Sequence, residues 1–252
     1  MNGLKLSRLA MALGLIAAGL LLFLVVPALR EATSGLTNLM TWAFWITSIV
    51  LVIVLYMERD REPQPAEVQG PAFARFLFSD RRAGMFWLPI RLFVGFEWFE
   101  AGLHKLEDPA WISGGTALRG YWERAVAIPE GGRPAITFEW YRDFLNWLLA
   151  INAEPWFAQL IVFGEIAVGI GLLVGALTGV AAFFGATMNM SFLLAGSAST
   201  NPIMFALAVG LILAWKVAGY IGVDRYLLPR LGTPWEPHVI VPRRPASNPR
   251  AG

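Results

Sequence analysis

The sequence contains no cysteine, and this absence excludes several kinds of chemistry. Without thiols the chain cannot form a disulfide, ligate an iron–sulfur cluster, attach a haem covalently or use a thiol nucleophile. It has only two histidines, His104 and His238. No glycine-rich dinucleotide or phosphate-binding motif follows a predicted strand, because no strand is predicted, and we expect no metal site. If the chain takes part in redox chemistry, its electron carrier is borrowed or is a lipid-soluble quinone.

Charge is also scarce. Of the 252 residues, 15% are charged and 56% are hydrophobic, and the mean hydropathy is +0.55, which lies outside the usual range of soluble domains. The apolar residues fall into runs that approach the roughly 20 residues needed to cross a bilayer. We therefore predict an all-α, polytopic membrane bundle of about six transmembrane helices, at residues 9–29, 39–57, 85–103, 155–176, 179–195 and 202–222.

Polar segments divide the chain into predicted parts. Residues 1–57 form an N-terminal transmembrane hairpin, and residues 58–84 form a cytoplasmic linker rich in proline and charge, whose composition argues against a buried element. Residues 85–230 form a four-helix core, and residues 231–252 form a cytoplasmic tail. A signal peptide is the alternative for the first run, but the run exceeds the ~7 to 15 apolar residues of such peptides, so we expect a retained anchor.

The distribution of lysine and arginine predicts the orientation. With a cytoplasmic N-terminus, most of the twenty basic residues fall in the short inside segments, as the positive-inside rule requires. Both termini are then cytoplasmic, residues 104–154 lie outside, and the protein is a multi-pass protein of a bacterial or archaeal cell membrane. The lipid bilayer is its main partner. The net charge of +2 follows from this topology and gives no reason to expect nucleic acid.

The long outer segment contains an amphipathic stretch at residues 136–151. Its apolar residues recur at helical spacing opposite a polar face, which predicts a helix lying in the headgroup plane. Two interpretations stay open: the helix caps the bundle, or it also covers an entrance for substrate or quinone. The apolar residues are Ile136, Trp140, Tyr141, Phe144, Leu145 and Leu148, and the polar ones are Glu139, Arg142, Asp143 and Asn146.

Ionisable residues inside the predicted spans are the main functional signal, because a charge in hydrocarbon costs at least ~2.5 kcal/mol on insertion scales. Glu97, Glu100 and His104 are spaced three and four residues apart, so they share one face of a helix. Arg91, Glu97, Glu165 and Asn189 are each expected near the bilayer centre, on three different helices.

Arg91 lies around the helix from this acidic face, so we expect it to pair with Glu165. The three carboxylates Glu97, Glu100 and Glu165 outnumber this one arginine, and at least one is expected to keep its proton, as a proton relay to a quinone would need. The alternative is that Arg91 and Glu165 only tie two helices together.

Several residues together resemble the DoxX/DoxD family of membrane proteins over residues 85–230. They are the stretch from Arg91 through Gly102 and Lys105; Glu165, Gly169, Leu172 and Gly175; Asn189, Phe192, Ala195 and Gly196; and Asn201, Pro202 and the run to Asp224. The likeness is greatest to the branch with a long outer segment, which includes the quinone-reducing subunit of thiosulfate:quinone oxidoreductase. It implies a four-helix core that passes electrons from an external donor, typically a reduced sulfur compound such as thiosulfate, to membrane quinone.

Two hypotheses of different classes follow. In the first, the chain is a quinone-linked oxidoreductase subunit that binds quinone between the third and fourth predicted spans, with Glu100, His104 and Glu165 as catalytic residues. The expected quinone or substrate contacts are Arg91, Glu97, Trp98, Lys105, Asn189 and Asn201. In the second, it is a non-catalytic accessory subunit that uses residues 1–57 to dock onto a larger respiratory or photosynthetic complex. Both imply further membrane or extracytoplasmic subunits; a small-molecule transporter is a weaker third alternative.

Overall fold

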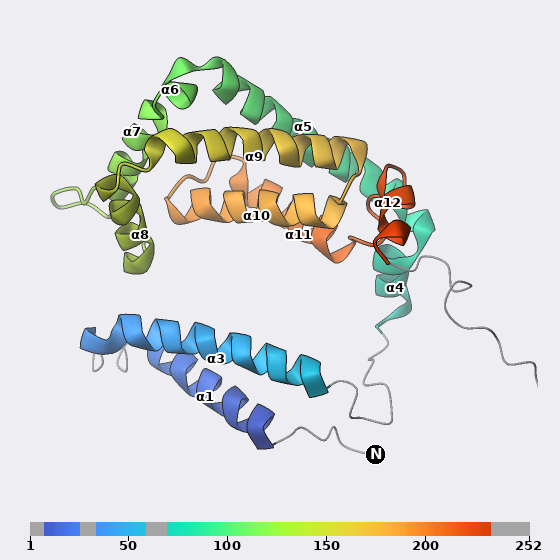
Figure 1. Ribbon diagram of the computed structural model, residues 1–252, viewed down its shortest axis with the longest axis horizontal. Coiled ribbons are helices and arrows are strands. Elements are labelled where there is room, and N and C mark those ends of the chain that lie inside the picture. The colour runs from blue at the N-terminus through green and yellow to red at the C-terminus, as the bar shows by residue number, and fades with distance from the viewer. Residues whose placement is uncertain (1–7, 26–33, 59–69, 233–252) are drawn as a thin grey trace, which may run out of the picture. The chain divides into compact units, whose positions relative to one another are not determined.

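The computed structural model describes residues 8–25, 34–58 and 70–232, and every regular element in these residues is a helix (Figure 1). The prediction of an all-α chain is confirmed. The chain divides into two compact units, residues 1–69 and 70–252. In the first unit, α1 (Arg8–Val25) packs against α3 (Thr37–Glu58), which follows the short η1 (Ser34–Leu36).

Four long helices form the core of the second unit: α5 (Gly84–Glu107), α9 (Glu154–Val174), α10 (Thr178–Leu194) and α11 (Asn201–Leu213). Helix α5 packs along α9, α9 packs on α10, and α10 packs on α11. Glycines let α5 and α9 approach closely, as small residues do in membrane helix pairs. A Cβ atom on Gly102 would lie 2.7 Å from the Ile166 Cγ1 atom, and one on Gly169 would lie 2.6 Å from the Phe99 nitrogen.

A cap of shorter helices covers the end of the core where α9 begins. It comprises α6 (Pro109–Ile112), α7 (Thr116–Val126) and α8 (Glu139–Ala150). The predicted helix at 136–151 is present as α8, but its buried face is narrower than predicted: Trp140 and Phe144 are exposed, whereas Tyr141 is buried. Leu118 and Trp122 of α7 join the buried residues of α8 in one apolar cluster.

The other end of the unit holds helices that the sequence pattern did not predict. Helix α4 (Ala72–Ser79) and η3 (Arg81–Ala83) occupy the predicted linker, and α4 buries no residue of its own. Helix α11 ends well before residue 222, and α12 (Asp224–Arg230) follows after a series of turns. Almost all of the predicted tail lies outside the described residues.

By length and composition, α9 is the one helix of the described residues that could cross a bilayer unaided. Helices α10 and α11 and the stretches 8–21 and 38–51 are apolar but shorter. Helix α5 is long enough, but it carries Arg91, Glu97, Glu100 and further charges. A membrane-compatible helix is therefore present, and the count of six spans stays a prediction.

Candidate functional site

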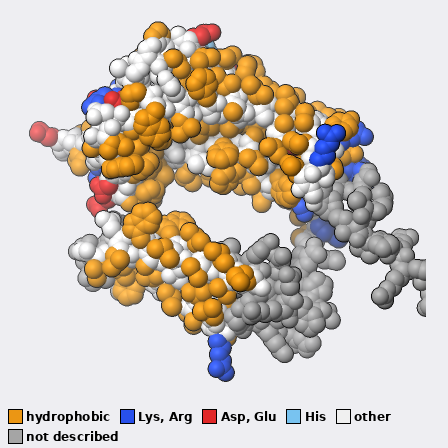
Figure 2. Space-filling view, viewed as in Figure 1, with side chains coloured by type: hydrophobic (Ala, Val, Ile, Leu, Met, Phe, Trp, Pro, Cys, Tyr) orange, Lys and Arg blue, Asp and Glu red, His pale blue; other side chains and the backbone are white. Residues whose placement is uncertain are grey.

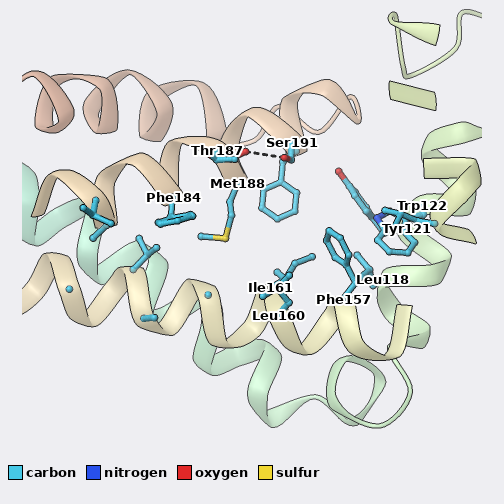
Figure 3. Close-up of a pocket in the computed structure, with 18 of the residues that line it drawn as sticks. Leu118, Tyr121, Trp122, Phe157, Leu160, Ile161, Phe184, Thr187, Met188 and Ser191 are labelled. Carbon is cyan, nitrogen blue, oxygen red and sulfur yellow. Dashed lines mark hydrogen bonds between the residues drawn. The ribbon is translucent and has the colours of Figure 1, made fainter. Parts of the chain in front are cut away.

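An apolar cavity of about 560 Å³ lies between α7, α8, α9 and α10 (Figure 3). Its volume falls in the range of small-molecule sites, roughly 300 to 1,000 Å³. Aromatic and aliphatic side chains form most of its wall, among them Tyr121, Trp122, Phe157, Ile161, Phe184 and Met188. Such a lining accommodates the ring or chain of a hydrophobic molecule.

Tyr121, Tyr141, Thr187 and Ser191 carry the hydroxyl groups among the residues that line the cavity. The Tyr141 hydroxyl donates a hydrogen bond of 2.8 Å to the Ser191 carbonyl oxygen. The Ser191 and Thr187 hydroxyls each donate 2.9 Å bonds to carbonyls of their own helix, those of Thr187 and Phe183. These three donors are therefore engaged.

Burial keeps the two phenols protonated. It raises the pKa of Tyr141 to about 12, and it also raises the pKa of Tyr121, an effect that nearby Ser197 partly offsets. The Tyr121 hydroxyl makes no direct hydrogen bond of good geometry to the described residues. This oxygen is fully buried on the side of Ser197, so it does not face the open space of the cavity.

A buried ion pair joins α5 to α9. The Lys105 Nζ atom lies 2.7 Å from Glu165 Oε2, with the Glu165 side chain 1% exposed and that of Lys105 21% exposed. The ammonium also lies 5.3 Å from the centre of the Trp111 ring, a cation–π distance. The prediction that Arg91 pairs with Glu165 is therefore wrong, because Lys105 occupies that position.

Arg91 instead binds carbonyls where α9 ends. It donates to Leu172 oxygen at 2.6 Å and to Ile221 oxygen at 2.8 Å, with a longer contact of 3.4 Å to Leu173. Helices α5 and α9 run antiparallel, so Arg91 faces the last turn of α9 while Glu165 lies beside the other half of α5. A cation at a helix C-terminus is favourable, because free carbonyls and the helix dipole are negative there.

Asp224, the first residue of α12, lies at the same end of the core as Arg91. Its fully buried carboxylate accepts the Leu177 N–H at 2.6 Å and the Thr178 N–H at 2.8 Å. These are the first amides of α10, so a distant residue satisfies donors that otherwise have no partner within the helix. Arg91 and Asp224 thus fix the turn from α9 to α10.

The remaining predicted site residues differ in burial and lie partly at the surface and partly in the core. Glu100 and His104 meet at 3.8 Å on the exposed surface of α5, with side chains 51% and 75% exposed. Asn201 is half-buried, and its amide donates to the Ser197 oxygen at 3.1 Å. Glu97 is half-buried, whereas Trp98 and Asn189 are buried.

None of the predicted site residues lines the cavity. Quinone was expected between the third and fourth predicted spans, which correspond to α5 and α9. Glycine contacts close that interface, and the cavity lies instead where α9 and α10 meet α7 and α8. Sequence reasoning missed the contribution of α7, although Leu118, Trp122 and Ala125 recur at helical spacing and are all buried.

Comparison with family models, curated proteins and solved structures finds no match to this chain. The resemblance to the DoxX/DoxD family accordingly stays a prediction. Among the described residues, no group of three or more histidine, aspartate or glutamate side chains is placed to hold a metal ion.

Proposed function

We propose that the chain is a multi-pass membrane protein whose α1–α3 hairpin and four long core helices lie in the bilayer. The support is the number of large apolar side chains exposed along these helices. Soluble monomers rarely expose such continuous apolar surface. Figure 2 shows hydrophobic side chains over most of the visible helical surface. Examples are Ile46 and Ile49 in the hairpin and Phe93, Phe96, Phe163, Phe183 and Ile203 in the core.

Within this membrane protein, the α7–α10 cavity is the proposed quinone site, and the chain serves as a membrane subunit of a quinone-linked oxidoreductase. The observation that carries this proposal is the aromatic cavity of about 560 Å³ between these helices. Several lining residues are also exposed, including Phe144, Leu160, Val180 and Phe184, so the cavity opens at the surface of the helices. In a bilayer that opening faces lipid, which is where a quinone resides.

Reduction of a quinone to a quinol consumes two electrons and two protons. The electrons come from an external donor, of the reduced sulfur class that the DoxX/DoxD resemblance implies, through a partner subunit. This chain binds and orients the ring through the aromatic and aliphatic side chains of the cavity wall. The Glu100–His104 pair takes protons from water, and the adjacent Lys105–Glu165 pair carries them inward.

A matched pair of alanine substitutions tests the site. Ala167 lines the cavity and Ala206 lies on α11 away from it, and both are exposed on apolar helices. We expect Ala167→Phe to weaken binding of a short-chain quinone at least tenfold, measured by quenching of tryptophan fluorescence in detergent. Ala206→Phe should bind as wild type does. Equal binding by the two variants, or no binding by wild type, would count against the proposed site.

A second assay separates the catalytic role from the accessory role. The accessory role is favoured by the observation that the α1–α3 hairpin belongs to a compact unit of its own. For the catalytic role, Glu100→Gln and His104→Ala should each lower quinone reduction in membranes about 10²-fold at unchanged protein level. For the accessory role, both variants keep wild-type rates, and deletion of residues 1–57 releases the chain from its host complex.

A further inference from the structure

Three side chains in the middle of the core carry buried polar atoms without a hydrogen-bond partner among the described residues. The atoms are Trp98 Nε1, Asn189 Nδ2 and Glu165 Oε1. They come from α5, α10 and α9, and the three residues are 4%, 1% and 1% exposed. A buried polar group without a partner costs roughly 1 to 3 kcal/mol, so three in one region call for a common partner.

The packing of the helices brings the three side chains together. A Cβ atom on Gly185 would lie 2.8 Å from Trp98 Nε1 and 3.2 Å from the Val168 side chain, so α5, α9 and α10 meet at this glycine. Asn189 lies one turn beyond Gly185 on α10, and Glu165 lies about one turn before Val168 on α9.

The step from Gly185 forward to Asn189 on α10 and the step from Val168 back to Glu165 on α9 lead toward the same end of the core, because α9 and α10 run antiparallel. A Cβ atom on Gly171 would contact Ala181, and one on Gly164 would contact Met188, which gives the register of the pair. Asn189 and Glu165 therefore lie at the same level, about one helical turn from the glycine that the Trp98 indole nitrogen contacts.

We infer that Trp98, Asn189 and Glu165 bind a water molecule between the three helices. The two side-chain nitrogens can only donate here and the carboxylate oxygen can accept, and a water molecule that accepts two hydrogen bonds and donates one satisfies all three. Buried waters typically make about three such bonds to groups that otherwise lack partners. An anion would face the Glu165 carboxylate, and a cation would face two donors, so a small neutral molecule fits best.

This water extends the Lys105–Glu165 pair into the core. It places exchangeable protons behind Val168 and Met188, which line the cavity. Its role in delivering protons to a quinone rests on the proposed function, whereas the water site itself does not depend on what the cavity binds.

The indole of Trp98 provides a direct test. Ultraviolet resonance Raman spectra report whether an indole N–H is hydrogen-bonded, and subtracting the spectrum of Trp98→Phe from that of wild type isolates Trp98. In quinone-free detergent we expect a hydrogen-bonded indole band, and its N–H should exchange rapidly in D₂O. A band of a free indole, or a slowly exchanging one, would overturn the inference.

A stability measurement covers the case in which Trp98→Phe does not fold. Asn189→Leu should lower the ratio of folded to unfolded protein about tenfold or more, because it deprives a bound water of one partner. Asn146→Leu, at an exposed position of α8, is the control and should change it little. If Asn189 has no partner, leucine should instead leave stability equal or raise it, which would refute the water site.

Added quinone separates the two proposals. If quinone shifts the Trp98 band, the indole contacts the quinone, and the assignment to water is wrong. If wild type binds no quinone while the band remains hydrogen-bonded, the proposed function fails and the water site stands.

Discussion

Removing Lys105 should destabilise the protein more than removing Lys105 and Glu165 together. In Lys105→Met, the Glu165 carboxylate remains buried but loses the ammonium group that lies 2.7 Å from it in the wild type. Breaking a buried ion pair in this way costs about 3 to 5 kcal/mol in soluble proteins. Because the lysine side chain is partly exposed, we expect a loss near 3 kcal/mol.

The reverse change should be milder. In Glu165→Gln, Lys105 keeps its contact with Trp111 and can extend its ammonium toward water, so we expect a loss of about 1 kcal/mol. The double variant leaves neither a stranded carboxylate nor a stranded ammonium, and we expect its loss to be closer to that of Glu165→Gln than to that of Lys105→Met. The coupling between the two sites should then be about 2 kcal/mol.

Reversible unfolding in mixed micelles, followed by tryptophan fluorescence, measures these free energies. His104→Ala is the control, since it removes only a 3.8 Å contact with Glu100 between two exposed side chains, and exposed pairs contribute about 0 to 1 kcal/mol even when both partners are charged. If the losses of the two single variants simply add in the double variant, the Lys105–Glu165 pair does not stabilise the core as reasoned.

Three further outcomes are expected. Gly175→Ala should destabilise the protein by about 2 kcal/mol or more, because Gly175 has a φ of +68° and a Cβ atom there would collide with the Arg91 guanidinium. The control Gly114→Ala, at a φ of +97° in open space, should show the cost of backbone strain alone. Equal losses of stability in the two variants would exclude the collision. Burial raises the pKa of Tyr141 to about 12 from an unfolded value near 10, so its contribution to stability is complete below about pH 10 and is lost as the pH rises toward 12. In that window the free energy of unfolding should fall less steeply with pH in Tyr141→Phe than in the wild type. A reporter fused after Gly252 should be active only in its cytoplasmic form and one inserted near Gly131 only in its external form, and the opposite result for either would reverse the predicted topology.

The long helices could be predicted from the sequence because each depends on a property summed over many residues. Apolar runs predicted α3, α9 and α10 to within two residues at either end, since no single contact decides where such a helix lies. The short helices α7 and α12 could not be found in the same way. Helix α7 buries a face against α8 and α9. Helix α12 begins at Asp224, whose buried carboxylate accepts a hydrogen bond from an amide 46 residues earlier.

The partner of a buried charge was harder to predict than the helix that carries it. Depth counted from the middle of each span placed Arg91 level with Glu165. The true register depends on where Gly95, Gly102 and Gly169 let α5 and α9 touch, and those contacts put Lys105 beside Glu165. The cavity was missed for a related reason: its wall comes from four helices, and no local pattern records how they meet.

The bond from Asp224 to the start of α10 has a consequence for biosynthesis. As the ribosome delivers the chain from its N-terminus, α9 and α10 emerge before the carboxylate that receives the Leu177 and Thr178 amides. The Arg91 guanidinium is likewise synthesised before the Ile221 carbonyl to which it donates a hydrogen bond. If these helices insert into a bilayer as proposed, unpaired amides would be costly in hydrocarbon, so this turn would stay near water or accept temporary partners until α12 leaves the ribosome. Helix α12 therefore fixes a junction between two helices that are synthesised before it, and a chain that stops before Asp224 would contain α9 and α10 but leave that junction open.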